Sequence, residues 1–429
     1  MDYAATTPMD SGVEITMRPF YRGIFGNPSS SHLHGQEASR AVFFARQAIA
    51  TALNADYTEI VFTGSATEAN NLAIRGVFEH ILGKHALFSP AEKRHSLSAH
   101  RSALKSGDQA GALPRCSLEH TPNTPLRIVV SQIEHESVYE ACMALKRLHG
   151  AEIVEVPVNG EGIVNLTKLE EALNENTVLV SVQMVNSELG VIQPIKEIGE
   201  SIKKYKAGAG GAVYPLFHTD AVQAFQYIKC DVADLGVDMM TLSSHKIYGP
   251  KGIGLLYVRK LPTNHYPLST FVFGGGQESG MRSGTENVAA VVGFGKAVKI
   301  AEKMRVKESK RVAVLRDALW KGIKKILPDA ELNGPPVGGS KNRLPNNLSV
   351  YLPARPAQDV CIELDLMGIA VSPGTACASR AAEPSRIIKA LGFSGDRPTS
   401  SIRFSLGRQT TAGEIRSVLA TLKKRFGVK

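Results

Sequence analysis

A single lysine stands between two strand-like apolar runs in the stretch TLSSHKIYGPKGIGLLYV, residues 241–258. Lys246 follows a serine and a histidine and precedes a Tyr-Gly-Pro-Lys-Gly turn. An amine buried at such a junction is readily held in its neutral, nucleophilic form, because desolvation disfavours the ammonium ion. The setting favours a lysine that bonds covalently to a carbonyl compound over one that only binds phosphate.

An aspartate and a histidine each follow a strand-like run. Asp220 lies in FHTDAVQAF at the end of an apolar run, where a carboxylate without a partner would be costly. This carboxylate needs a cation or several donors, so it either caps a helix or pairs with a ring nitrogen that stays protonated. His135 ends RIVVSQIEH and is either a satisfied core histidine or a ring that stacks on a ligand.

The stretch FTGSATEANNLAIRG leads from a strand into an amphipathic helix that begins near Ala66 and Thr67. Free backbone N–H groups at a helix start, beside a hydroxyl, suit a phosphate group; an ordinary helix cap is the alternative. Ser243 and His245 add two donors for an anion. A nucleophilic amine, an acid for a ring nitrogen, a stacking ring and a phosphate site are together the parts needed to hold pyridoxal 5'-phosphate.

The elements that must position these groups alternate between strand-like runs and helical patterns, which predicts an α/β domain with a mainly parallel central sheet. Open parallel sheets bind ligands at the carboxyl ends of their strands, where these side chains stand. Strands are expected at 59–64, 127–135, 152–158, 177–185, 215–222, 238–244 and 252–258. A long amphipathic pattern over Val288–Ile326 then leads to strands at 346–352 and 368–374 and to a terminal helix from Ala412.

These patterns predict two domains and an N-terminal segment. Residues 15–261 would form the large cofactor-binding domain, 262–429 a smaller α+β domain, and 1–14 a segment that packs with the smaller domain. The segment 89–125 is poor in apolar periodicity and rich in serine, alanine, proline and basic residues, where only a short connection is needed. We predict that it is a mobile surface insertion.

Composition narrows the class of protein. The chain has 429 residues, of which 43% are hydrophobic and 21% are charged, as in an ordinary globular enzyme. It shows neither a run of about 18 uncharged apolar residues nor a hydrophobic leader, so a cytoplasmic location and no membrane partner are expected. The formal charge of +10 is spread along the chain without an arginine-rich arm, so no nucleic-acid partner is expected. Five scattered cysteines without a C-x-x-C pair suggest neither a disulfide framework nor a metal site.

Further motifs join those above: MDYAATTP at the start, FGNPSSSH at 25–32, GMRSGTEN at 280–287, VSPGTACAS at 371–379 and SSIRFSLGR at 400–408. Taken together, the motifs resemble those of cysteine desulfurases of the NifS/IscS-like group, in the class V aminotransferase family of pyridoxal-phosphate-dependent enzymes of fold type I. The similarity covers nearly the whole chain in the right order, apart from the segment 89–125.

The resemblance implies a homodimer that converts L-cysteine to L-alanine and passes the sulfur on to an acceptor, such as an iron–sulfur scaffold or a thiolation relay. Lys246 would bind the cofactor as a Schiff base and later shuttle a proton at the substrate Cα. Asp220 would pair with the pyridine nitrogen, and His135 would stack on the ring and assist proton transfer. Cys377, in a loop of small residues, would take the sulfur as a persulfide.

The resemblance also implies the remaining contacts of the cofactor and the substrate. Gln223 would bond the phenolic oxygen of the cofactor, and Arg403 would bind the substrate carboxylate through its bidentate fork, beside Asn186 and Ser187. The phosphate would be held by Ala66, Thr67, Ser243 and His245, and by Thr285 of the partner subunit.

Two motifs depart from the usual pattern of this group. VNSELG at 185–190 has Ser187 where the group usually has a second asparagine, and GSATEA at 64–69 rearranges the usual SGATES. Three alternative functions stay open from sequence: a selenocysteine lyase of the same fold, a transaminase in which Cys377 has no task, and a catalytically idle scaffold that binds a sulfur carrier.

Overall fold

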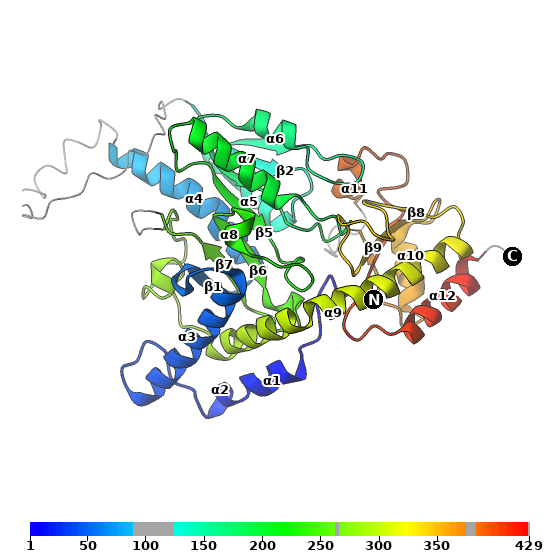
Figure 1. Cartoon of the computed structure of the whole chain (residues 1–429), viewed down its shortest axis with the longest axis horizontal. Helices are drawn as coiled ribbons and strands as arrows, with labels where there is room; N and C mark the ends of the chain where they lie inside the picture. Colours follow the sequence, from blue (N-terminus) through cyan, green and yellow to red (C-terminus); the bar gives the residue numbers. More distant parts are fainter. Residues whose placement is uncertain (89–123, 262–265, 375–382, 428–429) are drawn as a thin grey trace, which may run out of the picture.

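Two β-sheets organise the computed structural model, which describes residues 1–88, 124–261, 266–374 and 383–427 (Figure 1). Cys377 and nearly all of the segment 89–125 lie outside the described residues, so what was expected of them stays a prediction. In the described part of the chain, no helix combines the length and the apolar character that crossing a membrane requires.

The larger sheet has seven strands in the order β1-β7-β6-β5-β4-β2-β3. The strands from β6 to β3 in this order run parallel, whereas β7 is antiparallel to both of its neighbours. Every residue of β4, β5 and β6 is buried, as expected for parallel strands covered on both faces. The predicted mainly parallel sheet is confirmed. Its strands are β1 (Ile60–Thr63), β2 (Arg127–Ser131), β3 (Glu152–Val156), β4 (Thr177–Ser181), β5 (Leu216–Asp220), β6 (Met239–Ser243) and β7 (Gly254–Val258).

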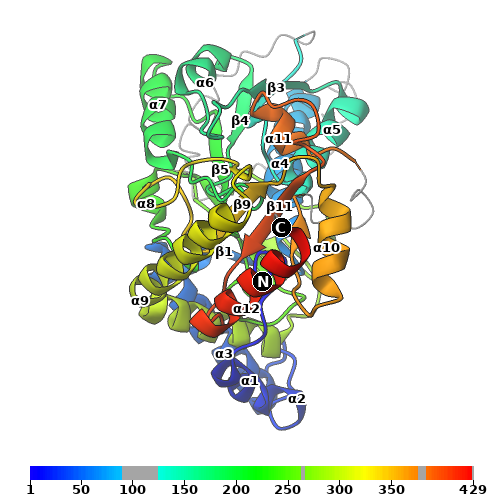
Figure 2. The ribbon, with the colours of Figure 1, turned by 90° about the vertical axis from the view of Figure 1, so that its right-hand side faces the viewer.

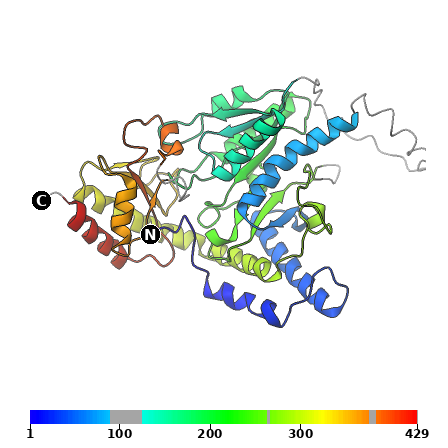
Figure 3. The same ribbon diagram turned by 180° about the vertical axis from the view of Figure 1, so that it is seen from behind.

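Helices cover both faces of this sheet, because alternate strand residues point to opposite sides (Figures 1 and 3). Ile128 and Val130 pack with α4 and α5, whereas Val129 between them belongs to the core formed with α3, α7 and part of α9. The helices of this unit are α1 (Ser11–Met17), α2 (Pro19–Arg22), α3 (Leu33–Leu53), α4 (Ala66–Phe88), α5 (Glu136–His149), α6 (Leu166–Ala172), α7 (Ile195–Gly208) and α8 (Val232–Leu235).

The amphipathic pattern predicted over Val288–Ile326 forms one continuous helix with these bounds, α9. Its first half contributes Phe294 and Val298 to the core under the large sheet. Its second half contributes Val312 and Leu319 to the core of the smaller unit. The helix therefore links the two units as a single rod (Figure 1).

The smaller unit has a four-stranded antiparallel sheet in the order β10-β11-β9-β8, and Figure 2 looks onto this unit. Its elements are β8 (Glu331–Leu332), β9 (Asn347–Tyr351), α10 (Ala357–Asp365), β10 (Ser372–Pro373), α11 (Arg386–Ala390), β11 (Ser401–Ser405) and α12 (Ala412–Phe426). The predicted smaller α+β unit is confirmed, and the strand expected at 368–374 is only two residues long. The exact domain limits stay a prediction, because α9 belongs to both cores.

The N-terminal segment lies against the smaller unit. The Ser405 N–H donates to the Met1 carbonyl (2.9 Å), and the Tyr3 N–H donates to the Ser405 carbonyl (3.3 Å). The chain then crosses to the large unit, where α1 packs on α9. Residues 4 and 5 consequently pass over the region between the two sheets.

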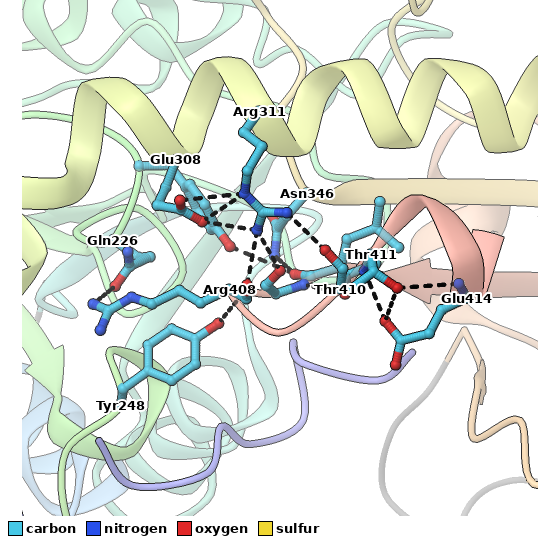
Figure 4. Close-up of polar contacts among 12 residues, drawn as sticks. Gln226, Tyr248, Glu308, Arg311, Asn346, Arg408, Thr410, Thr411 and Glu414 are labelled. Carbon is cyan, nitrogen blue, oxygen red and sulfur yellow. Dashed lines mark hydrogen bonds and ion pairs between the residues drawn. The ribbon is translucent and has the colours of Figure 1, made fainter. Parts of the chain in front are cut away.

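A second connection ties the smaller unit to the turn that follows Lys246 (Figure 4). The Arg408 guanidinium lies 4.0 Å from the Tyr248 ring centre and donates to the Gln226 side-chain oxygen (3.0 Å). The Arg408 backbone N–H donates to the Tyr248 hydroxyl (2.6 Å), and Arg311 on α9 donates to the Arg408 carbonyl (3.0 Å). These contacts couple the position of the smaller unit to the lysine-bearing turn.

Candidate active site

A cavity of about 450 Å³ opens at the carboxyl ends of the central parallel strands. Its position is the one expected for a ligand site in an open parallel sheet. Most of the predicted site residues line it: Ala66, Thr67, His135, Ser187, Asp220, Gln223, Ser243, His245, Lys246 and Arg403. The fold thus gathers residues from separate segments of the chain into one place.

Lys246 ends a short 3-10 turn, Ser244–Lys246, directly after β6. Its Nζ donates to the carbonyl oxygens of Ala4 (2.5 Å) and Ala5 (2.7 Å) in the crossing N-terminal segment. Burial, followed by the nearby Arg403 charge, lowers the pKa of Lys246 to about 8. An amine with this pKa is partly neutral near physiological pH and is a competent nucleophile.

Asp220 is the last residue of β5 and is only 7% exposed. Its Oδ2 accepts a hydrogen bond from the Asn70 amide (2.8 Å), and its Oδ1 accepts one from the Val222 N–H (3.0 Å). Two neutral donors leave lone pairs on both oxygens for a further donor. Gln223, one turn further on, also lines the cavity and donates to the Ala4 carbonyl (3.0 Å).

His135 stands between β2 and α5, where it serves as the N-cap of α5. Its Nδ1 accepts a hydrogen bond from the Ser137 N–H (3.2 Å) and lies 2.8 Å from the Ser137 hydroxyl. The ring is exposed and lines the cavity beside Asp220. It can therefore meet the face of a planar ligand.

An anion site is built from the start of α4 and the end of β6. Ala66 and Thr67 occupy the first turn of α4, whose backbone N–H groups have no partner within the helix. His245 donates to or accepts from Thr6 through Nδ1 (3.0 Å), and burial followed by the Lys246 charge lowers its pKa to about 4. His245 is consequently neutral and, with the Ser243 hydroxyl, supplies uncharged donors to the cavity.

Arg403 in β11 brings a guanidinium from the smaller unit to the cavity, and it is 1% exposed. Its Nη2 donates to Asp2 Oδ1 (2.8 Å), and its Nη1 donates to the Ser187 carbonyl (3.2 Å). Its Nε is buried and has no partner among the described residues. The guanidinium therefore keeps one donor that none of the described residues uses.

Two of the predicted site residues, Asn186 and Thr285, are not among the residues that line this cavity, and Thr285 was expected to reach it from the partner subunit. The Asn186 side chain is used by the backbone: its Oδ1 accepts from the N–H groups of Glu188 (2.9 Å) and Leu189 (2.8 Å), and its Nδ2 donates to the Ile133 carbonyl (3.0 Å). Thr285 lines a separate cavity of about 200 Å³. Cys377 lies outside the described residues, so its expected role stays a prediction.

Three residues near the cavity were not singled out from sequence: Asn70, Asp2 and Glu188. Asn70 lies three positions after Thr67, and this helical spacing places both residues on one face of α4. The spacing was therefore a signal in the sequence that could have identified Asn70. Asp2 and Glu188 had no such local signal, because their contacts come from distant segments. Burial raises the pKa of Glu188 to about 7, and its Oε1 accepts from the Ser385 hydroxyl (2.7 Å).

The residues of the cavity fit pyridoxal 5'-phosphate. Asp220 is a buried carboxylate with lone pairs to spare, as a protonated pyridine nitrogen requires. Lys246 is a partly neutral amine for the aldehyde carbon. The start of α4, with Ser243 and His245, supplies neutral donors for a phosphate. No metal ion is needed for any of these contacts.

Comparison with known proteins identifies the family of this chain. The model for aminotransferase class V matches residues 1–110 and 104–418. A protein named cysteine desulfurase IscS from Dictyoglomus turgidum is 38% identical over 424 residues, which cover 99% of this chain and 93% of that protein. One of the same name from Pectobacterium carotovorum is 40% identical over 432 residues, which cover 100% and 92%.

Solved structures agree with the sequence matches. A protein described as NifS-like superposes with a TM-score of 0.80 at 31% identity, covering 99% of this chain and 97% of that one. SspA, solved in complex with cysteine, gives a TM-score of 0.70 at 30% identity, covering 94% and 97%. The fold-type expectation is confirmed. With its cavity, its sheet order and full-length relatives at this level of identity, the chain belongs to the class V aminotransferase family and, within it, to the cysteine desulfurases.

Proposed function

We propose that the protein converts L-cysteine to L-alanine and stores the released sulfur as a persulfide on Cys377. In the net reaction, the C–S bond of the substrate breaks, an S–S bond to the enzyme thiol forms, and the thiol proton ends on alanine. The observation that carries this proposal is the meeting of the Lys246 amine, the Asp220 carboxylate and the Arg403 guanidinium in one cavity. The name of the relatives, cysteine desulfurase, supports the same reaction.

Pyridoxal 5'-phosphate is the cofactor we propose for this cavity. When bound, it supplies an electron sink that stabilises negative charge at the substrate Cα. Lys246 would hold it covalently, Asp220 would keep its ring nitrogen protonated, and His135 would lie against its ring. Its phosphate would be bound by Ala66, Thr67, Ser243 and His245 and, across a homodimer interface, by Thr285 of the partner subunit. Gln223 would contact the phenolic oxygen.

Arg403 would bind the substrate carboxylate, and Ser187 lies beside it. The Ser187 carbonyl already accepts from Arg403 (3.2 Å), so the side chain of Ser187 is held next to the guanidinium. Asn186 would act indirectly, since its amide fixes the turn that presents Ser187. Lys246 would also take the proton from the substrate Cα and return it.

The state of the described cysteines supports the assignment of the sulfur-carrying thiol to Cys377. Burial raises the pKa of Cys230 and of Cys361 to about 12 and raises the pKa of Cys142 as well. Thiols with such pKa values are almost fully protonated near neutral pH, and the protonated form is a poor nucleophile. Cys116 and Cys377 lie outside the described residues, and only Cys377 belongs to a motif of the family.

We further propose that the protein works in the cytoplasm as a homodimer and hands its sulfur to an acceptor protein. An iron–sulfur scaffold or a thiolation relay would suit the chemistry, because either takes sulfur from a persulfide. The formal charge of +10 favours an acidic acceptor surface. These finer proposals rest on the family and on composition.

The deciding experiment incubates the cofactor-loaded protein with L-cysteine and a reducing agent and measures alanine and sulfide. Equal amounts of the two products are expected, and L-selenocysteine in a parallel reaction measures the preference for selenium. A keto acid in place of alanine would indicate transamination and overturn the proposal. A protein that binds no pyridoxal 5'-phosphate and forms neither product would be an idle scaffold.

A further inference from the structure

A continuous line of hydrogen bonds joins Asp220 to His135 through two residues without an assigned role, Asn70 and Ser137. Asn70 Nδ2 donates to Asp220 Oδ2 (2.8 Å) and to the Ser137 hydroxyl (2.8 Å). The Ser137 hydroxyl in turn lies 2.8 Å from His135 Nδ1. Asn70, Ser137 and Asp220 are buried, with exposed fractions of 0%, 9% and 7%.

We propose that Asn70 and Ser137 are positioning residues that fix the proton of neutral His135 on Nε2, so that this imidazole offers the cavity a hydrogen-bond donor and no base. The inference rests on the proposed function for its catalytic meaning. The hydrogen bonds from which it is argued do not depend on that function.

The direction of each hydrogen bond follows from the carboxylate at one end. An ionised Asp220 can only accept, so the Asn70 amide must turn its NH₂ group toward it. The opposite orientation would set the Asn70 oxygen against Asp220 Oδ2. The second hydrogen of the same NH₂ group then points to the Ser137 oxygen. A hydroxyl that accepts at its oxygen is free to donate its own hydrogen, and His135 Nδ1 is the acceptor within reach.

The backbone at the start of α5 also favours the tautomer of His135 that has its proton on Nε2. The Ser137 N–H also points at His135 Nδ1 (3.2 Å), so this nitrogen faces two donors. A proton on Nδ1 would face the N–H of Ser137 and would displace the hydroxyl hydrogen. Neutral His135 therefore carries its proton on Nε2, the nitrogen that remains for the cavity.

The cost of this arrangement indicates that Asn70 is not a simple packing residue. Its Oδ1 is buried and has no hydrogen-bond partner among the described residues. An unsatisfied buried carbonyl destabilises the folded protein, whereas an apolar side chain of similar shape would avoid that cost. What the amide provides in return is the pair of N–H donors that orders Asp220 and Ser137.

The tautomer of His135 determines which residue can act as a base in the cavity. With its lone pair on Nδ1 turned into α5, neutral His135 has no lone pair to accept a proton from a ligand. The base that removes the Cα proton is then Lys246, whose amine is partly neutral. His135 contributes a ring face and one N–H donor.

Histidine tautomers can be read directly by long-range ¹H–¹⁵N correlation NMR of protein labelled with ¹⁵N-histidine. The chain has 12 histidines, so the His135 signals are identified as those lost in His135→Gln. The cofactor-loaded protein is measured at a pH where the ring is neutral, as wild type and as Ser137→Ala and Asn70→Leu. Ser137→Thr keeps the hydroxyl, and Asn71→Leu makes the same change at the neighbouring position, where the amide donates to the Thr67 carbonyl (2.9 Å).

In wild type, Ser137→Thr and Asn71→Leu, we expect the unprotonated nitrogen of His135 to be Nδ1. In Ser137→Ala and Asn70→Leu, the share of the Nδ1–H tautomer should rise at least twofold. A wild-type ring protonated on Nδ1 would overturn the proposal. Unchanged tautomer shares in both Ser137→Ala and Asn70→Leu would also overturn it, since the backbone N–H alone would then set the tautomer. Absence of alanine from L-cysteine would instead refute the proposed function and leave the tautomer result standing.

Discussion

The Arg403 guanidinium donates a 2.8 Å hydrogen bond to the carboxylate of Asp2, 401 positions earlier in the chain. Arg403 is 1% exposed, whereas the Asp2 side chain is 23% exposed. A buried guanidinium needs an anionic partner, and Asp2 provides it. Arg403 is also the residue proposed to bind the substrate carboxylate, so Asp2 and the substrate would share one cation.

Replacing Asp2 should therefore destabilise the cofactor-loaded protein. For Asp2→Asn, we expect the free energy of unfolding in urea to fall by about 1.5–3 kcal/mol, the range for a hydrogen bond to a charged group. Saturating L-alanine should restore part of this loss, because its carboxylate can occupy Arg403. Asp234→Asn is the matched control, since it breaks a solvent-exposed ion pair with Lys196 and should change nothing measurable. An unchanged unfolding midpoint for Asp2→Asn would refute the pairing argument.

The lowered pKa of Lys246 predicts the pH dependence of cofactor attachment. Only the neutral amine attacks an aldehyde, so in cofactor-free protein the rate should rise about tenfold per pH unit and level off above a pH of about 8. Borohydride reduction and peptide mapping measure the fraction attached at Lys246, and Lys246→Ala is the blank. Arg403→Gln removes a positive charge that lowers this pKa, so its plateau should begin at higher pH. A plateau reached only near pH 10 in wild type would contradict the prediction.

The lowered pKa of Lys246 also predicts how the stability of the folded protein changes with pH. The folded-state pKa of Lys246 lies below its ordinary value of 10.5, so between about pH 8 and 10.5 the folded protein binds fewer protons than the unfolded chain. The stability of the cofactor-free protein should therefore gain a rising contribution with pH in this window. Lys246→Met should lack that contribution.

Restoring the usual asparagine at position 187 should improve substrate binding. The contacts that hold Ser187 in place are made by its carbonyl, which accepts from Arg403 and from Asn347 (3.1 Å), so the side chain can change without disturbing them. For Ser187→Asn, we expect KM for L-cysteine to fall about two- to tenfold, as one added hydrogen bond allows, with stability unchanged. Ser187→Ala is the control and should behave as wild type. A strong rise of KM in Ser187→Ala would show that the serine hydroxyl already contacts the substrate.

Cofactor chemistry and sulfur storage should be separable at Cys377. Cys377→Ser is expected to keep the bound cofactor, because the residues of the cavity are unchanged, and to lose persulfide formation almost completely, because a hydroxyl cannot store sulfane sulfur. Mass spectrometry after incubation with L-cysteine should find one added sulfur on the Cys377 peptide of wild type and none in the mutant. Cys361→Ser should behave as wild type, since burial keeps that thiol protonated. A persulfide on Cys361 or Cys142 would identify a different carrier.

Much of this architecture is readable from local patterns. The strands of the large sheet and the bounds of α9 follow from apolar runs and helical periodicity, which are properties of neighbouring residues. The junction of Lys246 with β6 and the position of Asp220 at the end of β5 are equally local. Parallel strands place their carboxyl ends at one edge, so the sequence also indicated where these two side chains would meet.

The contacts that define the cavity depend on packing between distant segments. Asp2 reaches Arg403 and Asn70 reaches Asp220 only because the strand order and the crossing N-terminal segment bring them together. The use of the Asn186 amide by a short-range turn is likewise visible only in the folded structure. Apolar periodicity is a property of consecutive residues, whereas a hydrogen bond between residues 150 or 401 positions apart exists only after the sheet, α4 and α9 have packed.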